Sequence, residues 1–151
     1  MDRYPDPDVT ELAGVLDRRL EALLIDGLLV VGVIGLLGYV GGALLIEGSF
    51  GGFGGFLVAV QFISPVVLLG YQTVFEGYYG QTLGKRYRDI VVVTEDGDDC
   101  TWVAAVVRNL LRIVDALPAF YLVGVLVAYV SDEHQRLGDL AAGTRVVNVD
   151  E

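Results

Sequence analysis

Two pairs of charged residues lie inside stretches of this chain that are otherwise apolar. Arg19 and Asp26 belong to RRLEALLID, and Arg108 and Asp115 belong to RNLLRIVD, which also contains Arg112. In each pair the aspartate follows the arginine by seven positions, nearly two helical turns, so both side chains fall on one helix face. A carboxylate inside a membrane serves either as an ion-pair partner or as a group that exchanges protons. Both roles require it to face protein or water, because an ionised aspartate in lipid is costly.

The elements that must position these charges are long apolar segments. Residues 27–46 form a run of 20 residues without a charge, and residues 48–75 form another. About 20 apolar residues cross the hydrocarbon core of a bilayer as a helix. Hydrophobic residues make up 54% of the 151 residues, and the mean hydropathy is +0.57. We therefore predict an all-α integral membrane protein with two full transmembrane helices, at about residues 17–46 and 56–75, joined by a flexible loop at 47–55.

A third apolar stretch, residues 102–130, has two possible topologies. It contains Arg108, Arg112 and Asp115, and then Pro118, which breaks a helix. We favour a half-spanning helical hairpin over a third full crossing, and both remain open. Residues 90–93 and 144–149 are rich in β-branched side chains and predict two short cytoplasmic strands, the first followed by a turn at EDGDD.

The distribution of basic residues predicts the orientation in the cell membrane. Basic residues lie at or before the start of the first predicted helix and after the end of the second, and the loop between these helices has none. Arg3, Arg18 and Arg19 belong to the first group, and Lys85, Arg86 and Arg88 to the second. Cytoplasmic loops carry the excess of Lys and Arg, so we expect a polar cytoplasmic tail at residues 1–16 and a membrane domain at 17–149. A hairpin in the third stretch would also place Arg136 and Arg145 inside.

The composition argues against several classes of function. The net charge is −10, and such a surface repels nucleic acid. One cysteine and one histidine, Cys100 and His134, offer no metal-ligand set, and neither a catalytic triad nor a phosphate loop is visible. We expect no enzyme, no cofactor and no metal. The expected partners are the lipid bilayer and, through Gly38-x3-Gly42, either another helix of the same chain or a second copy in a homo-oligomer; no protein partner is identified.

A short pattern occurs twice. QTLGK at residues 81–85 and QRLGD at residues 135–139 each lead into a predicted strand, and each follows one of the Arg/Asp pairs. A duplication related by a pseudo-two-fold axis is one hypothesis for this order. In that arrangement Arg108 or Arg112 would face Asp26, and Arg19 would face Asp115.

These residues resemble the RDD family of small integral membrane proteins. The family is named for an arginine at the start of the first helix, an aspartate within that helix and a later aspartate, which match Arg19, Asp26 and Asp139. GQTLGKRYRDIVVV resembles the family's glycine–lysine loop with Gly84 and Lys85, and Arg108 matches a recurrent arginine before the last apolar stretch. Many members carry His before the final aspartate, where this chain has Gly138. The single lysine beside nine arginines resembles proteins of salt-loving archaea.

The resemblance implies transport, with monovalent cation/proton exchange among the suggestions for the family. In that hypothesis Asp26 titrates, and Arg19, Arg108 or Arg112 tunes it. The alternative is a membrane scaffold or assembly factor, in which the charged residues only hold the helices together. Arg112, Asp115 and Arg136 are then possible ion-pair partners. The transported ion, the oligomeric state and the partner are left open by the sequence.

Overall fold

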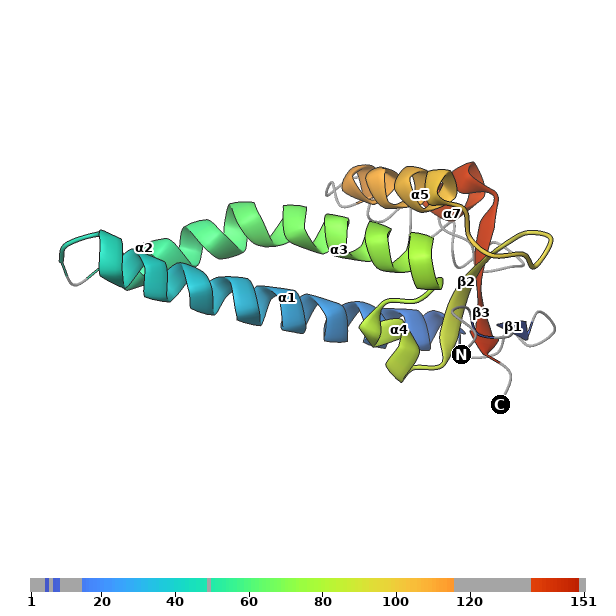
Figure 1. The fold of residues 1–151 in the computed structure, drawn as a ribbon, viewed down its shortest axis with the longest axis horizontal. Helices are drawn as coiled ribbons and strands as arrows, with labels where there is room; N and C mark the ends of the chain where they lie inside the picture. The colour runs from blue at the N-terminus through green and yellow to red at the C-terminus, as the bar shows by residue number, and fades with distance from the viewer. Residues whose placement is uncertain (1–4, 6, 9–14, 49, 116–136, 150–151) are drawn as a thin grey trace.

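A long helical hairpin carries a group of short elements at one end (Figure 1). The computed structural model describes residues 5, 7–8, 15–48, 50–115 and 137–149. α1 (Val15–Leu45) forms one arm, and α2 (Gly51–Val58), the π-helical turn η1 (Ala59–Ile63) and α3 (Ser64–Tyr79) form the other. Both arms are long and apolar enough to cross a bilayer, and most of their apolar side chains are exposed. The predicted membrane fold class with two spanning helices is confirmed.

The two arms meet most closely through glycines near the loop that joins them. A Cβ on Gly38 would lie 2.6 Å from the carbonyl oxygen of Gly55, and one on Gly42 would collide with the backbone of Gly51. Only glycine allows this approach, which explains Gly38-x3-Gly42 as packing within one chain. The flexible loop predicted at residues 47–55 is therefore wrong in part, because α2 begins at Gly51 and its glycines are the contact with α1.

The short elements form a small sheet and three helices beside it. They are α4 (Leu83–Tyr87), β2 (Ile90–Thr94), α5 (Trp102–Asp115), α7 (Leu137–Ala142), β3 (Thr144–Val149) and β1 (Pro7–Asp8). The strand order is β1-β3-β2, and both pairings are antiparallel. β2 and β3 confirm the two predicted strands. The third apolar stretch begins as α5, whereas the choice between a hairpin and a crossing concerns residues 116–136, outside the described residues.

The sheet joins the start of α1 to the start of α5. One hydrophobic cluster combines Ile90 and Val146 of the sheet with Val15 of α1 and Ala105 of α5, all of them buried. The four consecutive apolar residues of β2 are fully buried, which their β-branched side chains favour. The start of α1 is thereby fixed beside α5, although most of the chain separates them in sequence.

Two parts of the structure are related as the duplication hypothesis expects. α4 begins within QTLGK and leads to β2, and α7 begins within QRLGD and leads to β3. In the antiparallel pairing of β2 with β3, the central pair is Val92 and Val146. The sequence separation of this pair equals that of Gly84 and Gly138, the glycines of the two motifs. The residue before each strand has a left-handed backbone: Asp89 (φ 52°) and Gly143 (φ 59°). The two units are thus arranged about a local two-fold axis between the paired strands.

Candidate functional site: a buried charged cluster

Seven charged side chains gather where α4, α5 and α7 pack around the polar ends of α1 and α3. We call them the charged cluster: Arg19, Asp26, Glu76, Lys85, Arg108, Arg112 and Asp139. All but Arg112 are at most 6% exposed. Buried charges are stable only when they are paired and hydrogen-bonded, so the partners of each define the site.

Asp26 is held by the loop and helix that follow α3. Its carboxylate accepts hydrogen bonds from the Tyr71 hydroxyl (2.9 Å), the Thr82 hydroxyl (2.5 Å) and the backbone N–H of Gly84 (2.8 Å). Thr82 also caps α4, because its Oγ1 accepts a hydrogen bond from the backbone N–H of Lys85. Asp26 therefore fixes α4 against α1.

Gly84 allows this contact because it has no side chain. A Cβ there would collide with the carbonyl oxygen of Ala22 and lie 2.9 Å from the Asp26 carboxylate. Gly138 has the matching place on α7, where a Cβ would lie 2.7 Å from the carbonyl oxygen of Arg108 on α5. The glycine of the glycine–lysine motif is thus explained by close backbone approach.

Glu76 is the centre of a second set of contacts. It is fully buried, and its carboxylate meets Lys85 Nζ (2.5 Å), Arg108 Nε (3.3 Å) and Asn109 Nδ2 (2.9 Å). Glu76 is not among the site residues predicted from the sequence, because it comes just after the predicted second helix. It is the only acidic residue between Glu47 and Asp89 in the sequence. A single carboxylate at the end of a long apolar segment could have identified Glu76 as a candidate site residue.

Asp139 joins the C-terminal helix to two other helices. Its carboxylate pairs with Arg19 of α1 and, at 3.0 Å, with Arg108 Nη2 of α5. Arg108 thus lies between two buried carboxylates, those of Glu76 and Asp139. Arg19, Asp26 and Asp139, which the resemblance matched to the three residues in the family's name, are brought to one site, where Arg19 contacts Asp139 and lines a cavity with Asp26.

Spacing of four residues on two helices explains how α5 and α3 meet. Gln72 and Glu76 lie one turn apart on α3, and Arg108 and Arg112 lie one turn apart on α5. Arg112 donates to the Gln72 side-chain oxygen, and Arg108 pairs with Glu76, so the helices run antiparallel at this contact.

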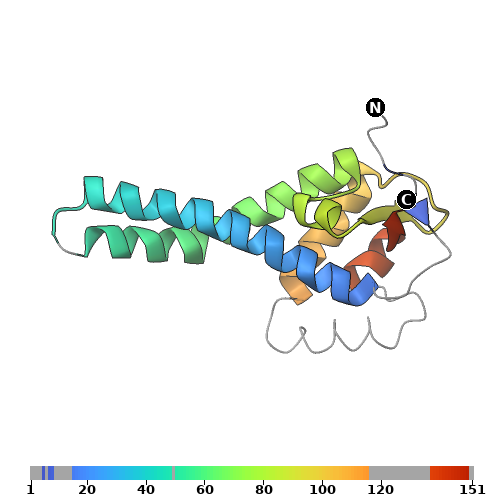
Figure 2. The same cartoon turned by 90° about the horizontal axis from the view of Figure 1, so that it is seen from below.

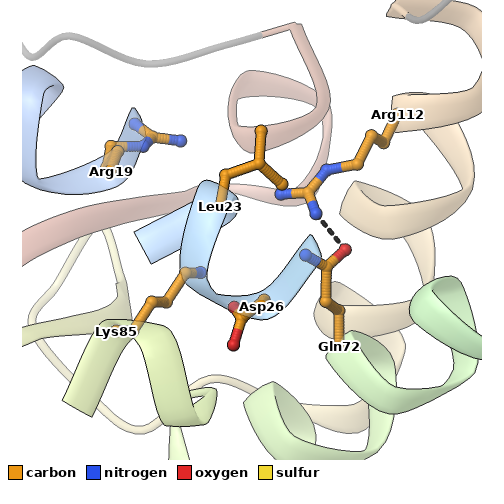
Figure 3. A pocket seen from close by; sticks show the side chains of 6 residues that line it. All are labelled: Arg19, Leu23, Asp26, Gln72, Lys85 and Arg112. Carbon is orange, nitrogen blue, oxygen red and sulfur yellow. Dashed lines mark hydrogen bonds between the residues drawn. The ribbon is translucent and has the colours of Figure 1, made fainter. Parts of the chain in front are cut away.

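A small cavity lies inside the cluster. It is lined by Arg19, Leu23, Asp26, Gln72, Lys85 and Arg112, and Figure 3 shows these side chains converging from four helices. Its volume of about 10 Å³ suits about one water molecule, and its polar lining offers hydrogen-bond partners. Within the part of the chain that the structure describes, no three His, Cys, Asp or Glu side chains form a group that could hold a metal ion.

Lys85 is the member of the cluster that can change its charge near neutral pH. Burial lowers the pKa of Lys85 from its ordinary value of 10.5 to about 8, and the carboxylate of Glu76 opposes this shift. Lys85 lines the cavity together with Asp26. An amine that releases its proton near pH 8 beside a water-sized cavity can act as a proton donor or acceptor.

The observed partners differ from those in the duplication hypothesis. The hydrogen bonds that the structure gives Asp26 come from Tyr71, Thr82 and Gly84, whereas Arg108 is placed on Glu76 and Asp139. Those donors were missed, because hydroxyl and backbone groups leave no charge pattern in the sequence. The side chain of Asp115, as well as His134 and Arg136, lies outside the described residues, so the predictions on them stay predictions.

Comparison with known protein families matches residues 13–143 to the RDD family. No curated protein and no solved structure matches the chain. The match covers both long helices, the glycine–lysine motif and Asp139, and it agrees with the resemblance seen in the sequence. With two helices able to span a bilayer and the family's arginine and two aspartates at one buried site, the chain belongs to the RDD family of membrane proteins.

Proposed function

We propose that this protein is a small transporter of the cell membrane that exchanges a monovalent cation for protons. The observation that carries the proposal is the water-sized cavity that Asp26 and Lys85 share. Ionisable groups on the interior side of membrane helices commonly mark ion and proton pathways. Here a carboxylate and an amine with a lowered pKa meet at one cavity, and the lipid-facing surface of the hairpin is apolar.

The chemistry of exchange follows from competition for one carboxylate. Asp26 and the hydroxyl groups of Tyr71 and Thr82 place several oxygen atoms together, and hard cations prefer oxygen ligands. A proton or a cation neutralises Asp26, so the two ions exclude each other. Lys85 supports this competition, because loss of its proton removes a positive charge that repels a cation from the cavity.

We place the N-terminus and the Lys85 motif in the cytoplasm. The basic residues that flank the hairpin lie at the end with the sheet, and cytoplasmic segments carry the excess of such residues. Two spanning helices enclose little space for an ion pathway, so we also propose that the transporter works as a homo-oligomer.

The proposal is tested in inverted membrane vesicles with a pH-sensitive dye. After a proton gradient has formed, adding sodium or potassium is expected to dissipate it with the wild-type protein and not with Asp26→Asn. Glu21→Gln is the matched control, since it removes a carboxylate on the same helix that pairs with Arg88 at the surface. Equal responses of wild type and Asp26→Asn would rule out this role for Asp26.

A membrane scaffold or assembly factor is the second candidate, and a different observation favours it. Asp139 joins α7 to Arg19 of α1 and Arg108 of α5, which is what a purely structural ion-pair network requires. This function expects a reproducible protein partner in a mild-detergent pull-down, captured by wild type and lost when Asp139→Asn loosens the polar end. Cation-dependent proton flux in the absence of any partner would count against it.

A further inference from the structure

The outer face of α5 is apolar along its whole length, although its inner face carries the arginines of the charged cluster. The large apolar side chains on the outer face are about half exposed or more, apart from Val106 at 40%: Trp102, Val103, Val106, Leu110 and Ile113. Ala105 and Arg108 on the opposite face are buried. A helix with this division lies between an apolar medium and polar protein.

The length of the hairpin fixes the level of α5 relative to a bilayer. A hydrocarbon core of ~30 Å corresponds to about 20 helical residues. Counted from the loop that joins the arms, 20 residues of α1 end at Asp26, and 20 residues from Gly51 end just before Tyr71. The hydrogen bond between Tyr71 and Asp26 therefore lies at the edge of the hydrocarbon, and α5 packs on α3 from this level outward.

The contacts with α3 show that α5 is strongly inclined. Arg112 donates a hydrogen bond to Gln72, and the Trp102 ring packs on Gly77. Trp102 and Arg112, ten positions apart on α5, therefore contact residues of α3 that are only five positions, or about 7.5 Å, apart. A helix of 14 residues is about 21 Å long. α5 consequently runs obliquely across the hairpin, as Figure 2 shows, and not along it.

Aromatic residues lie at the same level. Tyr78 and Tyr79 end α3 with their ring centroids 4.7 Å apart, and Tyr87 of α4 is 73% exposed. In Figure 1, α4 lies on the other side of the hairpin from α5. Tyr and Trp are enriched where membrane hydrocarbon meets water. These rings and Trp102 of α5 form such a belt around the end of the hairpin.

We propose that α5 is an interfacial helix whose outer face inserts into the boundary between lipid headgroups and acyl chains. Its occupant is the bilayer, because this face continues the apolar surface of the spanning helices at the level of the aromatic belt. The acidic chain gives no attraction to anionic headgroups, so contact with the acyl chains supplies the binding. α5 thereby covers the charged cluster from the lipid side.

The single tryptophan of the chain makes the test direct. The full-length protein is reconstituted in phosphatidylcholine vesicles, and Trp102 fluorescence is quenched with lipids that carry a spin label at carbon 5 or carbon 12. The shallow label is expected to quench Trp102 more strongly. A Trp102→Phe/Ile113→Trp variant, with the probe at the other end of α5, is expected to show the same preference.

Trp102→Phe/Leu37→Trp is the control, because Leu37 is exposed near the middle of residues 26–45, the part of α1 that spans the hydrocarbon, and should favour the deep label. If Ile113→Trp instead favours the deep label, α5 enters the bilayer as part of a crossing and the proposal is wrong. If aqueous iodide quenches Trp102 and neither lipid label does, the face lies outside the membrane. If no quencher acts on it, protein covers the face, whether a second copy or a partner, and the proposal is also wrong.

Discussion

At the scale of single residues, the site depends on backbone contacts that are too close for any residue larger than glycine. Gly84 brings its backbone N–H to Asp26 because it has no Cβ, and Thr82 and Tyr71 complete the set of donors. The sequence predicted that Asp26 must be shielded from lipid, because an ionised aspartate in lipid is costly. It could not predict these donors, because they depend on how α4 folds back onto α1.

Gly84→Ala is expected to destabilise the protein by about 1–3 kcal/mol or more, as overpacking does, because the new Cβ collides with the backbone of Ala22. The free energy of unfolding in detergent measures this effect. Gly70→Ala is the control, since a Cβ at Gly70 meets no atom within 4 Å. Equal stability of the two variants would contradict the close approach of α4 to α1.

Lys85 makes the stability of the protein depend on pH. Its folded pKa of about 8 lies below its ordinary value of 10.5, so between these values the unfolded chain binds more protons than the folded one. Stability from this group therefore rises as the pH rises from about 8 toward 10.5. Thermal unfolding across this range should show the rise in wild type and a flatter profile in Lys85→Met. Identical profiles would mean that Lys85 titrates outside the window.

At the scale of elements, the charged cluster is held by helices that approach from distant parts of the chain. Gln72 and Glu76 on α3 meet Arg112 and Arg108 on α5, one helical turn apart on each side. Both long helices and two strands could be predicted from the sequence, because apolar runs and β-branched residues are local signals. It placed Gly51 in a loop, because glycine is a weak helix former and its packing against Gly42 is not local.

Asp139 is expected to be the strongest connection between elements. Asp139→Asn removes the carboxylate that Arg19 and Arg108 share, and breaking a buried pair costs about 3–5 kcal/mol. In a double-mutant cycle, the combined effect of Asp139→Asn and Arg19→Gln should be smaller than the sum of the two, since they remove one interaction. Additive effects would show that this pair contributes nothing. Glu21→Gln, which breaks an exposed pair, should cost at most about 1 kcal/mol.

At the scale of the whole molecule, an apolar hairpin ends in a compact polar unit. The charge-free part of α1, residues 27–45, matches the thickness of the hydrocarbon, and Asp26 of the charged cluster comes directly before it in the sequence. Asp26 therefore lies at the edge of the membrane core and not at its centre, which lowers the cost of its charge. In our proposal the cavity at this edge is the place where protons and cations exchange.

The most direct test of this proposal uses purified protein in liposomes that contain a pH-sensitive dye, so that no other transporter contributes. A sodium or potassium gradient should drive proton movement with wild type and with Glu21→Gln. With Asp26→Asn, the signal should fall to the level of protein-free liposomes while the melting temperature shows that the variant is folded. Proton movement by folded Asp26→Asn at the wild-type rate would contradict the proposal that Asp26 carries the exchange.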